Sequence, residues 1–366
     1  METAFEYVFP AIRGVQAGRE FYCSMCPLRL VPKIFIFDEA ELVPELRAQR
    51  VLNRARIPEI ARYVLHNRDT YVFSAITASI DGPVRFDATG DEGESSRVGA
   101  LRVDMKAQFI INDGQHRRAA IEMALKEDPS IGDETIAVVF FHDRGLDRCQ
   151  QMFADLNRYA VRPARSLGLL YDHRNELAKL TKLIVLRSNA FKDVVEMERS
   201  TLSERSRKLF TLSAIFSATD ALLGDDQIDD PQKSAAFCAE YWDLIAKYLP
   251  EWGFVRESKM TAGEVRRDFI HSHAIVLQAL GIAGRELLKL SERARKERCK
   301  ALAGIDWSRS NARLWEGRAL IGGRVSKASH NVTLTSNLVK QRLGLELGPE
   351  EKRVENAYKK GRASSG

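Results

Sequence analysis

One stretch decides the fold of the first half of the chain: Phe109-Ile110-Ile111-Asn112-Asp113-Gly114-Gln115-His116-Arg117-Arg118-Ala119-Ala120-Ile121. A short apolar run stops at Asn-Asp-Gly, and a basic segment with helical spacing of its apolar residues follows at once. This pattern predicts a strand at 109–111, a tight turn and a helix at 115–126. The first turn of a helix carries unpaired backbone N–H groups at the positive end of the helix dipole. With its basic side chains, this junction is expected to receive a phosphate group.

Three residues of the turn have expected roles in a phosphate site. Gly114 lets the backbone approach the anion, Arg117 can bind it through two N–H groups, and Asp113 could orient a base, a ribose or a metal. The alternative is an ordinary turn that only caps the helix, with its arginines in solvent. The residues alone leave open whether the phosphate belongs to a nucleotide or to a nucleic-acid backbone.

Bulk composition places the chain among globular proteins with room for two domains. It has 366 residues, of which 45% are hydrophobic and 29% are charged, and its net charge is +6. This charge fits an anionic partner without requiring one. The chain starts with an acidic segment instead of the basic start of a signal peptide, and no apolar run approaches the roughly 20 residues that cross a bilayer. The five cysteines, an odd number, then indicate reduced thiols, so we expect a cytoplasmic protein without a membrane segment.

The chain changes character after Gly145, which predicts an α+β fold in two parts. Runs rich in β-branched and aromatic residues predict strands at Lys33–Asp38, Tyr71–Ser79 and 135–141. Long helical patterns follow. We therefore expect an α+β domain over 1–145, a mostly helical domain over 146–347 and a charged, frayed tail over 348–366.

The longest helical pattern runs from Thr261 to about Lys300. It opens with Thr261-Ala-Gly-Glu264, the spacing of a capping box. Gly281 and Gly284 within it are expected either to bend the helix or to admit a neighbouring helix closely.

Three further basic segments are candidate contacts to nucleic acid or to the pocket at the turn. Arg205, Arg207 and Lys208 lie among hydroxyl residues before an apolar helix, a composition that suits DNA phosphates. Arg162 and Arg165 flank Pro163, which predicts a loop into a new helix start. In each case the alternative is a solvated or interdomain segment. Arg50 lies on a basic helix face that could line the pocket opposite the turn, or could form exposed salt bridges instead.

Cys23-Ser-Met-Cys26 has CxxC spacing, but no second pair completes a zinc site, so we expect no metal. Cys26 is a candidate regulatory thiol; the alternative is a buried structural cysteine. The chain contains neither a Walker A lysine motif nor GxGxxG.

With the Asp113-Gly-Gln-His-Arg117 turn at its centre, the chain resembles the DndB family of DGQHR-motif proteins from bacterial DNA sulfur-modification (phosphorothioation) clusters. The turn alone marks only the wider superfamily; the combination with other segments is specific. Those segments are Phe9–Arg19, Met25–Arg29, Glu45–Arg50, Phe73–Ile80, Phe153–Asn157, Arg162–Ser166 and Leu209–Ser213.

The resemblance implies a regulator of the modification operon that binds double-stranded promoter DNA, not the sulfur-transferring enzyme. It also implies an N-terminal domain similar to the ParB and sulfiredoxin group, in which a Gly-x-x-Arg turn holds nucleotide phosphates. Here that turn is Gly114 to Arg117. The match at Cys26 favours a role in control.

The leading hypothesis is therefore a cytoplasmic, DNA-binding repressor with a nucleotide pocket. The expected pocket residues are Asp113, Gly114, Gln115, His116, Arg117, Arg118, Asn157 and Arg50, and the expected DNA contacts are Arg162, Arg165, Arg205, Arg207 and Lys208. The ligand would be ATP or another nucleotide with Mg²⁺.

The first alternative is an NTPase, with or without nuclease activity, that uses Asp113, Gln115 and His116 for catalysis and Arg117 to stabilise phosphate charge. The second is a scaffold for other sulfur-modification proteins. A homo-oligomer is compatible with each of these functions.

Overall fold

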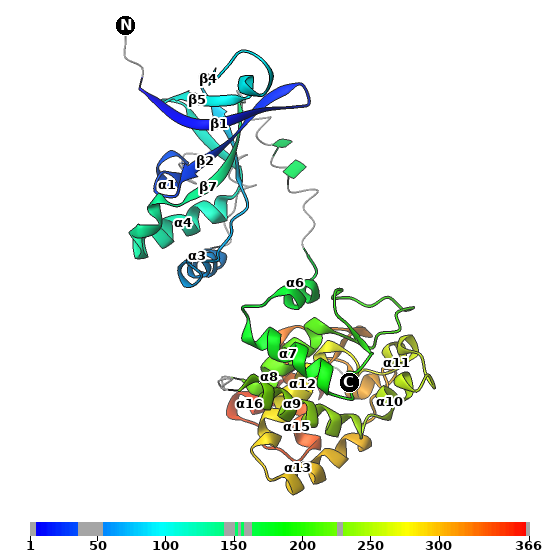
Figure 1. Ribbon diagram of the computed structural model, residues 1–366. Helices are drawn as coiled ribbons and strands as arrows, with labels where there is room; N and C mark the ends of the chain where they lie inside the picture. Colours follow the sequence, from blue (N-terminus) through cyan, green and yellow to red (C-terminus); the bar gives the residue numbers. More distant parts are fainter. Residues whose placement is uncertain are drawn as a thin grey trace. The chain divides into compact units, whose positions relative to one another are not determined.

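The computed structural model describes residues 5–35, 54–142, 151–152, 155–156, 163–224 and 230–363. The chain forms two compact units, Met1–Val161 and Arg162–Gly366. The first contains a seven-stranded sheet and the second is mostly helical (Figure 1). The predicted α+β fold class is confirmed, while the likeness to the ParB and sulfiredoxin group stays a prediction.

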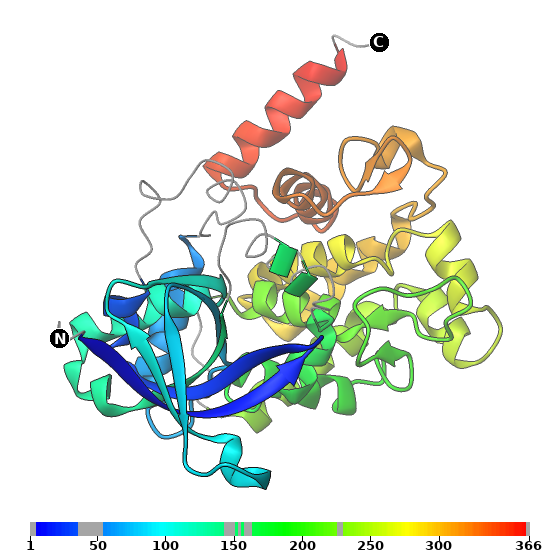
Figure 2. The same ribbon diagram turned by 90° about the horizontal axis from the view of Figure 1, so that it is seen from above.

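The first unit is a curved sheet with helices on one face (Figure 1). Its strands, in the order in which they pair, are β4 (Val84–Ala88), β5 (Val98–Asp104), β1 (Glu6–Gln16), β2 (Arg19–Pro27), β7 (Thr135–His142), β3 (Ile76–Asp81) and β6 (Gln108–Asp113). All neighbours are antiparallel except β3 and β7. The long strands β1 and β2 form the dark blue twisted ribbon in Figure 2. The helical elements are α1 (Val31–Ile34), α3 (Arg56–His66), η1 (Gly93–Ser96), α4 (Gln115–Glu127) and η2 (Pro129–Asp133).

An aromatic cluster fills the inside of the curved sheet. Phe9 of β1 packs 5.2 Å from Phe140 of β7 and 6.2 Å from Phe109 of β6, measured between ring centroids. Because β1 and β6 are far apart in the strand order, these contacts require a strongly coiled sheet. Phe35, directly after α1, closes the cluster against Phe109 and Phe140.

Two strand predictions in this unit are wrong in part. Lys33–Asp38 was expected to be a strand, but α1 ends at Ile34 and includes Lys33. Pro32 stands in the first turn of that helix, where its missing N–H costs nothing. The strand expected at Tyr71–Ser79 begins only at Ile76. The strand at 109–111, the turn and the helix from Gln115 are confirmed.

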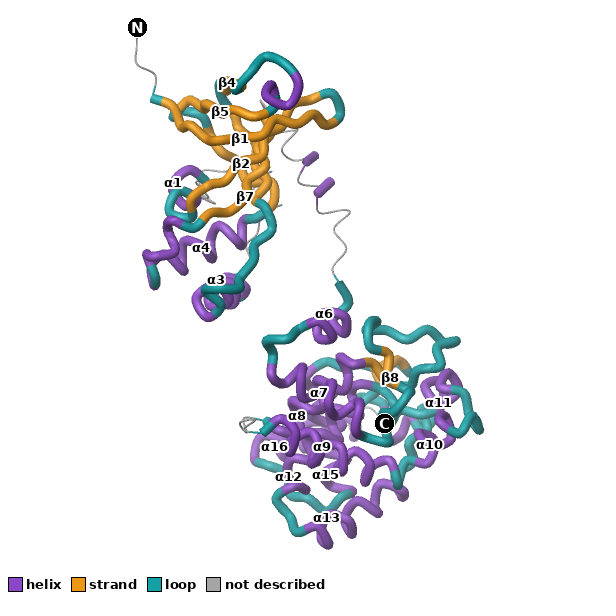
Figure 3. The backbone as a smooth tube through the Cα atoms, in the orientation of Figure 1, coloured by secondary structure: helices purple, strands orange, loops and turns teal. Residues whose placement is uncertain are grey.

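The second unit is mostly helical, with loops and short strands between the helices (Figure 3). Its helices are α6 (Arg165–Tyr171), α7 (Glu176–Arg187), α8 (Leu212–Leu223), α9 (Pro231–Ala246), α10 (Pro250–Arg256), α11 (Ala262–Asp268), α12 (Ala274–Leu288), α13 (Glu292–Cys299), η3 (Lys300–Gly304), α14 (Ala312–Trp315), α15 (Ser329–Arg342) and α16 (Pro349–Ala363). The short strands are β8 (Val195–Glu196), β9 (Phe210–Thr211), β10 (Leu320–Ile321) and β11 (Arg324–Val325). Trp242, Trp252 and Trp315 are fully buried in its core.

Helices α8 and α12 pack closely at the centre of this core. A Cβ atom on Gly281 would overlap the Ala218 carbonyl oxygen and would lie 3.2 Å from the Cβ of Ala221. The glycine therefore admits the neighbouring helix, which is one of the two roles expected for it.

The single helix predicted from Thr261 to about Lys300 is wrong. The chain forms α11, α12 and α13, with breaks after Asp268 and Leu288. The capping box at the start is confirmed, because the Glu264 N–H donates to Thr261 Oγ1 at 3.1 Å and the Thr261 N–H donates to Glu264 Oε2 at 2.8 Å. At the first break, the Ile270 N–H donates to the Trp307 carbonyl at 2.8 Å. A hydrogen bond to a distant segment thus takes the place of the bond within the helix.

Two histidines lie at the first break, of which His271 is fully buried and His273 partly buried. His271 Nδ1 accepts a hydrogen bond from Trp252 Nε1 at 3.0 Å, while Nε2 lies 3.1 Å from Glu251. His273 Nε2 donates to the Arg266 carbonyl at 2.8 Å. Burial lowers the pKa of His271 and brings the pKa of His273 to about 4. Both rings are therefore neutral at pH 7.

Mild acid should destabilise the folded chain through His273. The unfolded chain takes up this proton below about pH 6.5, whereas the folded chain resists it until about pH 4, so stability falls with pH in that window. We expect the free energy of unfolding to be about 2 kcal/mol lower at pH 5 than at pH 7.5 on this account. Urea unfolding at both pH values checks this. His273→Gln, whose amide can still donate to Arg266, should show a smaller difference; an equal difference would contradict the assignment.

The tail expected to fray at 348–366 is instead helical over Pro349–Ala363. Glu355 is buried there and forms a two-point ion pair with Arg318, at 3.0 and 2.6 Å. A charged segment can thus be fixed when its charge meets a buried partner. Among the described residues, no helix has the length and apolar character needed to span a bilayer.

Candidate functional site

The corner between β6 and α4 has a backbone shape that requires glycine. Gly114 adopts φ 114° and ψ 12°, and the Arg118 N–H donates to its carbonyl at 2.9 Å. A Cβ atom there would lie 3.0 Å from Ile76 Cγ1 and 3.1 Å from Arg117 Nη2. Gly114 also offers no side chain to cap the first turn of α4. The N-terminal end of the helix dipole therefore lies at a buried corner, where the side chains of Ile76 and Arg117 come close to Gly114.

Arg117 stands at this corner with part of its hydrogen-bonding capacity unused. Its Nη2 donates to Asp113 Oδ2 at 2.8 Å and to the Ala75 carbonyl at 3.0 Å. Its Nε is buried without a hydrogen-bond partner in the described part of the chain. The Asp113 side chain is 48% exposed. One carboxylate therefore orients the guanidinium without consuming all its donors.

His116 adds a neutral, half-buried ring to the corner. Burial lowers its pKa, and the positive charges of Arg56 and Arg117 lower it further. This effect places Arg56, the first residue of α3, within electrostatic reach of the corner. The sequence offered a basic helix face as one possible lining of the pocket, and the residue expected from it was Arg50, not Arg56.

Two expected pocket residues face inward instead. Arg118 donates to the Pro32 carbonyl at 3.1 Å and to the Phe35 carbonyl at 2.9 Å, and it pairs with Glu122. It therefore fastens α4 to α1 and is not available to an anion. Gln115 is buried, with its amide 3.5 Å from the Asn112 carbonyl. These contacts count against the roles predicted for Arg118 and Gln115 at a pocket, which stay predictions. Arg50, Asn157 and Arg162 lie outside the described residues.

The predicted DNA contacts in the second unit differ in exposure and in the hydrogen bonds that their side chains already form. Arg205 and Arg207 are exposed, and neither forms a hydrogen bond or ion pair with another described residue. Lys208 is half-buried and donates to the Asp193 carbonyl at 2.9 Å. Arg165 is exposed; it lies over the Phe216 ring and donates to Ser217 Oγ at 3.3 Å. Arg205 and Arg207 are therefore the freest of these cations.

Arg266 fixes the backbone that carries Arg205 and Arg207. Its guanidinium donates to the Ser203 carbonyl at 2.6 Å, to the Glu204 carbonyl at 3.3 Å and also to the carbonyls of Ser206 and Lys208. Burial lowers the pKa of Arg266, as expected for a charge enclosed by the loop. We call residues 203–208 the basic loop. Its path is set by main-chain contacts, so its exposed side chains remain free to bind.

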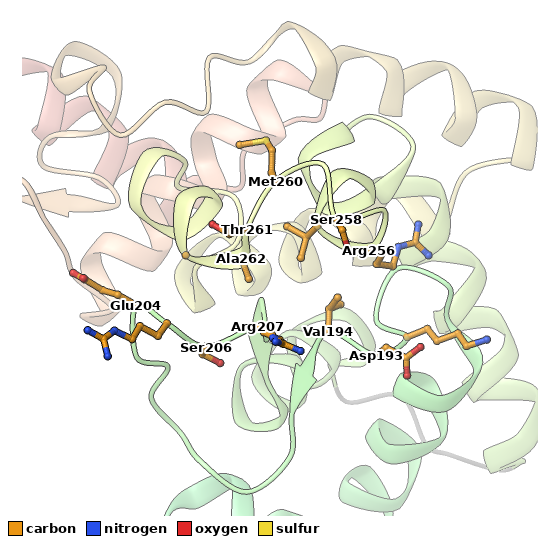
Figure 4. Close-up of a pocket in the computed structure, with 14 residues that line it drawn as sticks. Asp193, Val194, Glu204, Ser206, Arg207, Arg256, Ser258, Met260, Thr261 and Ala262 are labelled. Carbon is orange, nitrogen blue, oxygen red and sulfur yellow. The ribbon is translucent and has the colours of Figure 1, made fainter.

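A cavity of about 800 Å³ lies beside the basic loop. Figure 4 shows Arg207 near the middle of it, with Val194 on one side and the start of α11 at Thr261 and Ala262 above. Lys192 and Arg256 also line the cavity. No motif in the sequence marks these two cations, because the three lining segments come together only in the fold.

A family model described as "DndB: DNA-sulfur modification-associated" matches residues 9–346. The chain belongs to the DndB family. Neither a curated protein nor a solved structure matched it. The match covers the corner, the basic loop and the cavity, and it ends before α16. Membership gives this DndB-family protein a role in a DNA sulfur-modification system.

The cysteine predicted to be a regulatory thiol is deeply enclosed in this DndB-family chain. Cys26 is fully buried, and burial raises its pKa to about 12. A reactive thiol needs exposure and a lowered pKa, so the structure counts against the regulatory role of Cys26 and favours a packing role.

Cys23 is exposed, because residues three apart on a strand point to opposite faces. The two sulfurs cannot share a ligand. In the described residues, no three His, Cys, Asp or Glu side chains group as a metal site.

Proposed function

We propose that this DndB-family protein is a cytoplasmic, DNA-binding transcriptional regulator, a repressor of a DNA sulfur-modification operon. The family match supports a role in DNA sulfur modification. The observation that carries the DNA-binding proposal is the pair of exposed guanidinium groups of Arg205 and Arg207, which have no partner in the part of the chain that the structure describes, on the basic loop fixed by Arg266. Guanidinium groups suit phosphate oxygens, and a loop that is already ordered loses little entropy on binding.

The salt dependence of DNA binding tests this proposal. Each phosphate contact releases counterions, so log K falls with log salt concentration by about 0.9 per contact. On the upstream region of its own operon, the double variant Arg205→Gln/Arg207→Gln should lower this slope by about 2. Lys289→Gln, an exposed lysine that pairs with Glu286, serves as the matched control. A slope unchanged from the wild type, in a variant with normal thermal melting, would remove the basic loop from the DNA surface.

The corner at Gly114 supports a second candidate function: binding of a nucleotide with Mg²⁺, and its hydrolysis. The favouring observation is the buried Arg117 Nε without a partner among the described residues, beside the uncapped start of α4. A phosphate seated on the helix N–H groups could take this donor. Asp113, half exposed, would hold the metal or orient water, and Arg117 would stabilise negative charge that develops on the phosphate.

Asp113→Ala and Arg117→Ala test this second function. Each should lower ATP or GTP turnover in Mg²⁺ by at least about 10²-fold, because each removes a group that acts on the developing charge. Promoter DNA binding should persist, since the basic loop lies in the other unit. Lys126→Gln is the control, because Lys126 is exposed at the far end of the same helix. Absence of turnover by the pure wild-type protein would exclude the hydrolase.

A further inference from the structure

The cavity beside the basic loop combines cationic side chains with an apolar floor. Three segments meet there: residues 192–194, the basic loop and residues 255–263 (Figure 4). The cationic residues are Lys192, Arg205, Arg207 and Arg256, and the acidic residues are Asp193 and Glu204. Four positive and two negative charges leave a net charge of +2. The apolar surface comes from Val194, Val255, Met260 and Ala262.

The walls of this cavity are held in place independently of any ligand. Arg266 fixes the basic loop from behind through its carbonyl contacts, and Lys208 ties the loop to the Asp193 carbonyl at 2.9 Å. Helix α11 approaches the loop so closely that a Cβ on Gly263 would overlap the Glu204 carbonyl oxygen. The opening is thus a formed pocket and needs no rearrangement to accept a ligand.

The backbone of two lining residues is strained. Asp193 has φ 62° and Ser258 has φ 56°, in the left-handed region that disfavours residues with a side chain. They belong to the two segments that flank the basic loop. Strain of this kind concentrates at binding sites, where the surrounding structure maintains it.

We propose that this cavity binds a free nucleoside monophosphate, and that the bound nucleotide competes with DNA. The phosphate would lie among Arg207, Arg256 and Lys192, and the base would lie against Val194 and Val255. The volume falls within the roughly 300–1,000 Å³ typical of small-molecule pockets. The net charge of +2 balances a phosphate monoester dianion, whereas a triphosphate would leave excess negative charge in the cavity.

Competition follows from shared residues, and this step rests on the proposed DNA-binding function. Arg205 and Arg207 line the cavity and are also the proposed phosphate contacts of DNA. A guanidinium that holds the nucleotide is no longer available to the DNA backbone. The nucleotide would therefore act as an effector that releases the regulator from its operator.

Calorimetric titration of the full-length protein with AMP and GMP tests the binding step, with inorganic phosphate as the probe for a bare anion. We expect saturable binding of at least one nucleotide that is at least tenfold tighter than that of phosphate. Arg256→Gln should weaken it at least tenfold. Val255→Trp, which fills the cavity, should abolish it. Lys289→Gln, outside the cavity, should bind nucleotide as the wild type does.

A DNA titration then tests the competition. At a nucleotide concentration of ten times its own Kd, the apparent Kd for promoter DNA should rise about elevenfold in the wild type. In Val255→Trp the same addition should change it by less than twofold.

The possible failures are distinguishable from each other. No saturable binding of AMP or GMP, or binding that Arg256→Gln and Val255→Trp leave intact in normally folded protein, would overturn the nucleotide site. The site would also be overturned if the wild type bound no nucleotide while Val255→Trp weakened DNA binding. The cavity would then take a phosphate of DNA itself. Nucleotide binding together with an unchanged DNA salt slope in Arg205→Gln/Arg207→Gln would support the nucleotide site, but it would contradict the DNA surface and with it the competition.

Discussion

Replacement of Glu355 by alanine is expected to lower the free energy of unfolding by about 3–5 kcal/mol. The side chains of Glu355 and Arg318 are only 2% and 7% exposed, so removal of the carboxylate leaves a buried guanidinium charge without its partner. The Arg318 Nη1 contact to the Leu334 carbonyl, at 2.6 Å, neutralises no charge. Urea unfolding at pH 7 measures the loss.

Two further variants separate the buried pair from a general effect of helix α16. Glu350→Ala removes an exposed carboxylate that pairs with Arg353 in the same helix, and it should cost no more than about 1 kcal/mol. The double variant Arg318→Met/Glu355→Leu removes both charges and should recover most of the lost stability. If Glu355→Ala cost as little as Glu350→Ala, the pair would not hold α16 in place.

Gly281→Val should lower the free energy of unfolding by about 3 kcal/mol, because it forces α8 and α12 apart. The added Cβ would overlap the backbone oxygen of Ala218, which cannot move aside as a flexible side chain could. Both helices lie in the core of the second unit, so the displacement spreads to their neighbours. Chemical denaturation measures the change.

Gly253→Ala is the matched control for Gly281. Gly253 is also helical, in α10, and a Cβ there meets nothing within 4 Å. This substitution should be neutral or should stabilise the protein by up to about 1 kcal/mol, because alanine favours a helix over glycine. Equal losses at the two positions would show that helix propensity, not the close approach of α8 and α12, decides the outcome at Gly281.

The corner at Gly114 could be predicted because its causes are local. A strand period, a glycine that must adopt positive φ and a helical period follow one another within a few residues. The capping box at Thr261 was predictable for the same reason. Local rules of this kind give the element, its first residue and the direction in which its N–H groups point.

Long-range contacts decided what the sequence could not predict. The sequence places Arg118 among the polar residues of the turn, but its guanidinium donates to the carbonyls of Pro32 and Phe35, more than 80 positions earlier. The helical pattern after Thr261 breaks where Ile270 pairs with the backbone of Trp307. Such partners leave no local signal, so propensity alone predicts a longer helix and a freer arginine.

The cavity beside the basic loop was invisible in the sequence for a similar reason. Lys192 and Arg256 belong to other segments of the chain than Arg207, and the sequence around each is typical of a solvated cation. Only the fold brings the three together. The composition around Arg205 and Arg207 did identify one wall of the cavity, because basic and hydroxyl residues cluster there.

The contacts of Arg266 also bear on how related proteins can diverge. This side chain holds its loop through peptide carbonyls, which every residue type supplies, and not through the side chains at 203–208. Amino-acid replacements at residues 203–208 can therefore accumulate while the backbone of the loop keeps its path. On the proposed DNA-binding function, replacements at these positions would change the contacts to DNA while the framework set by Arg266 stays the same.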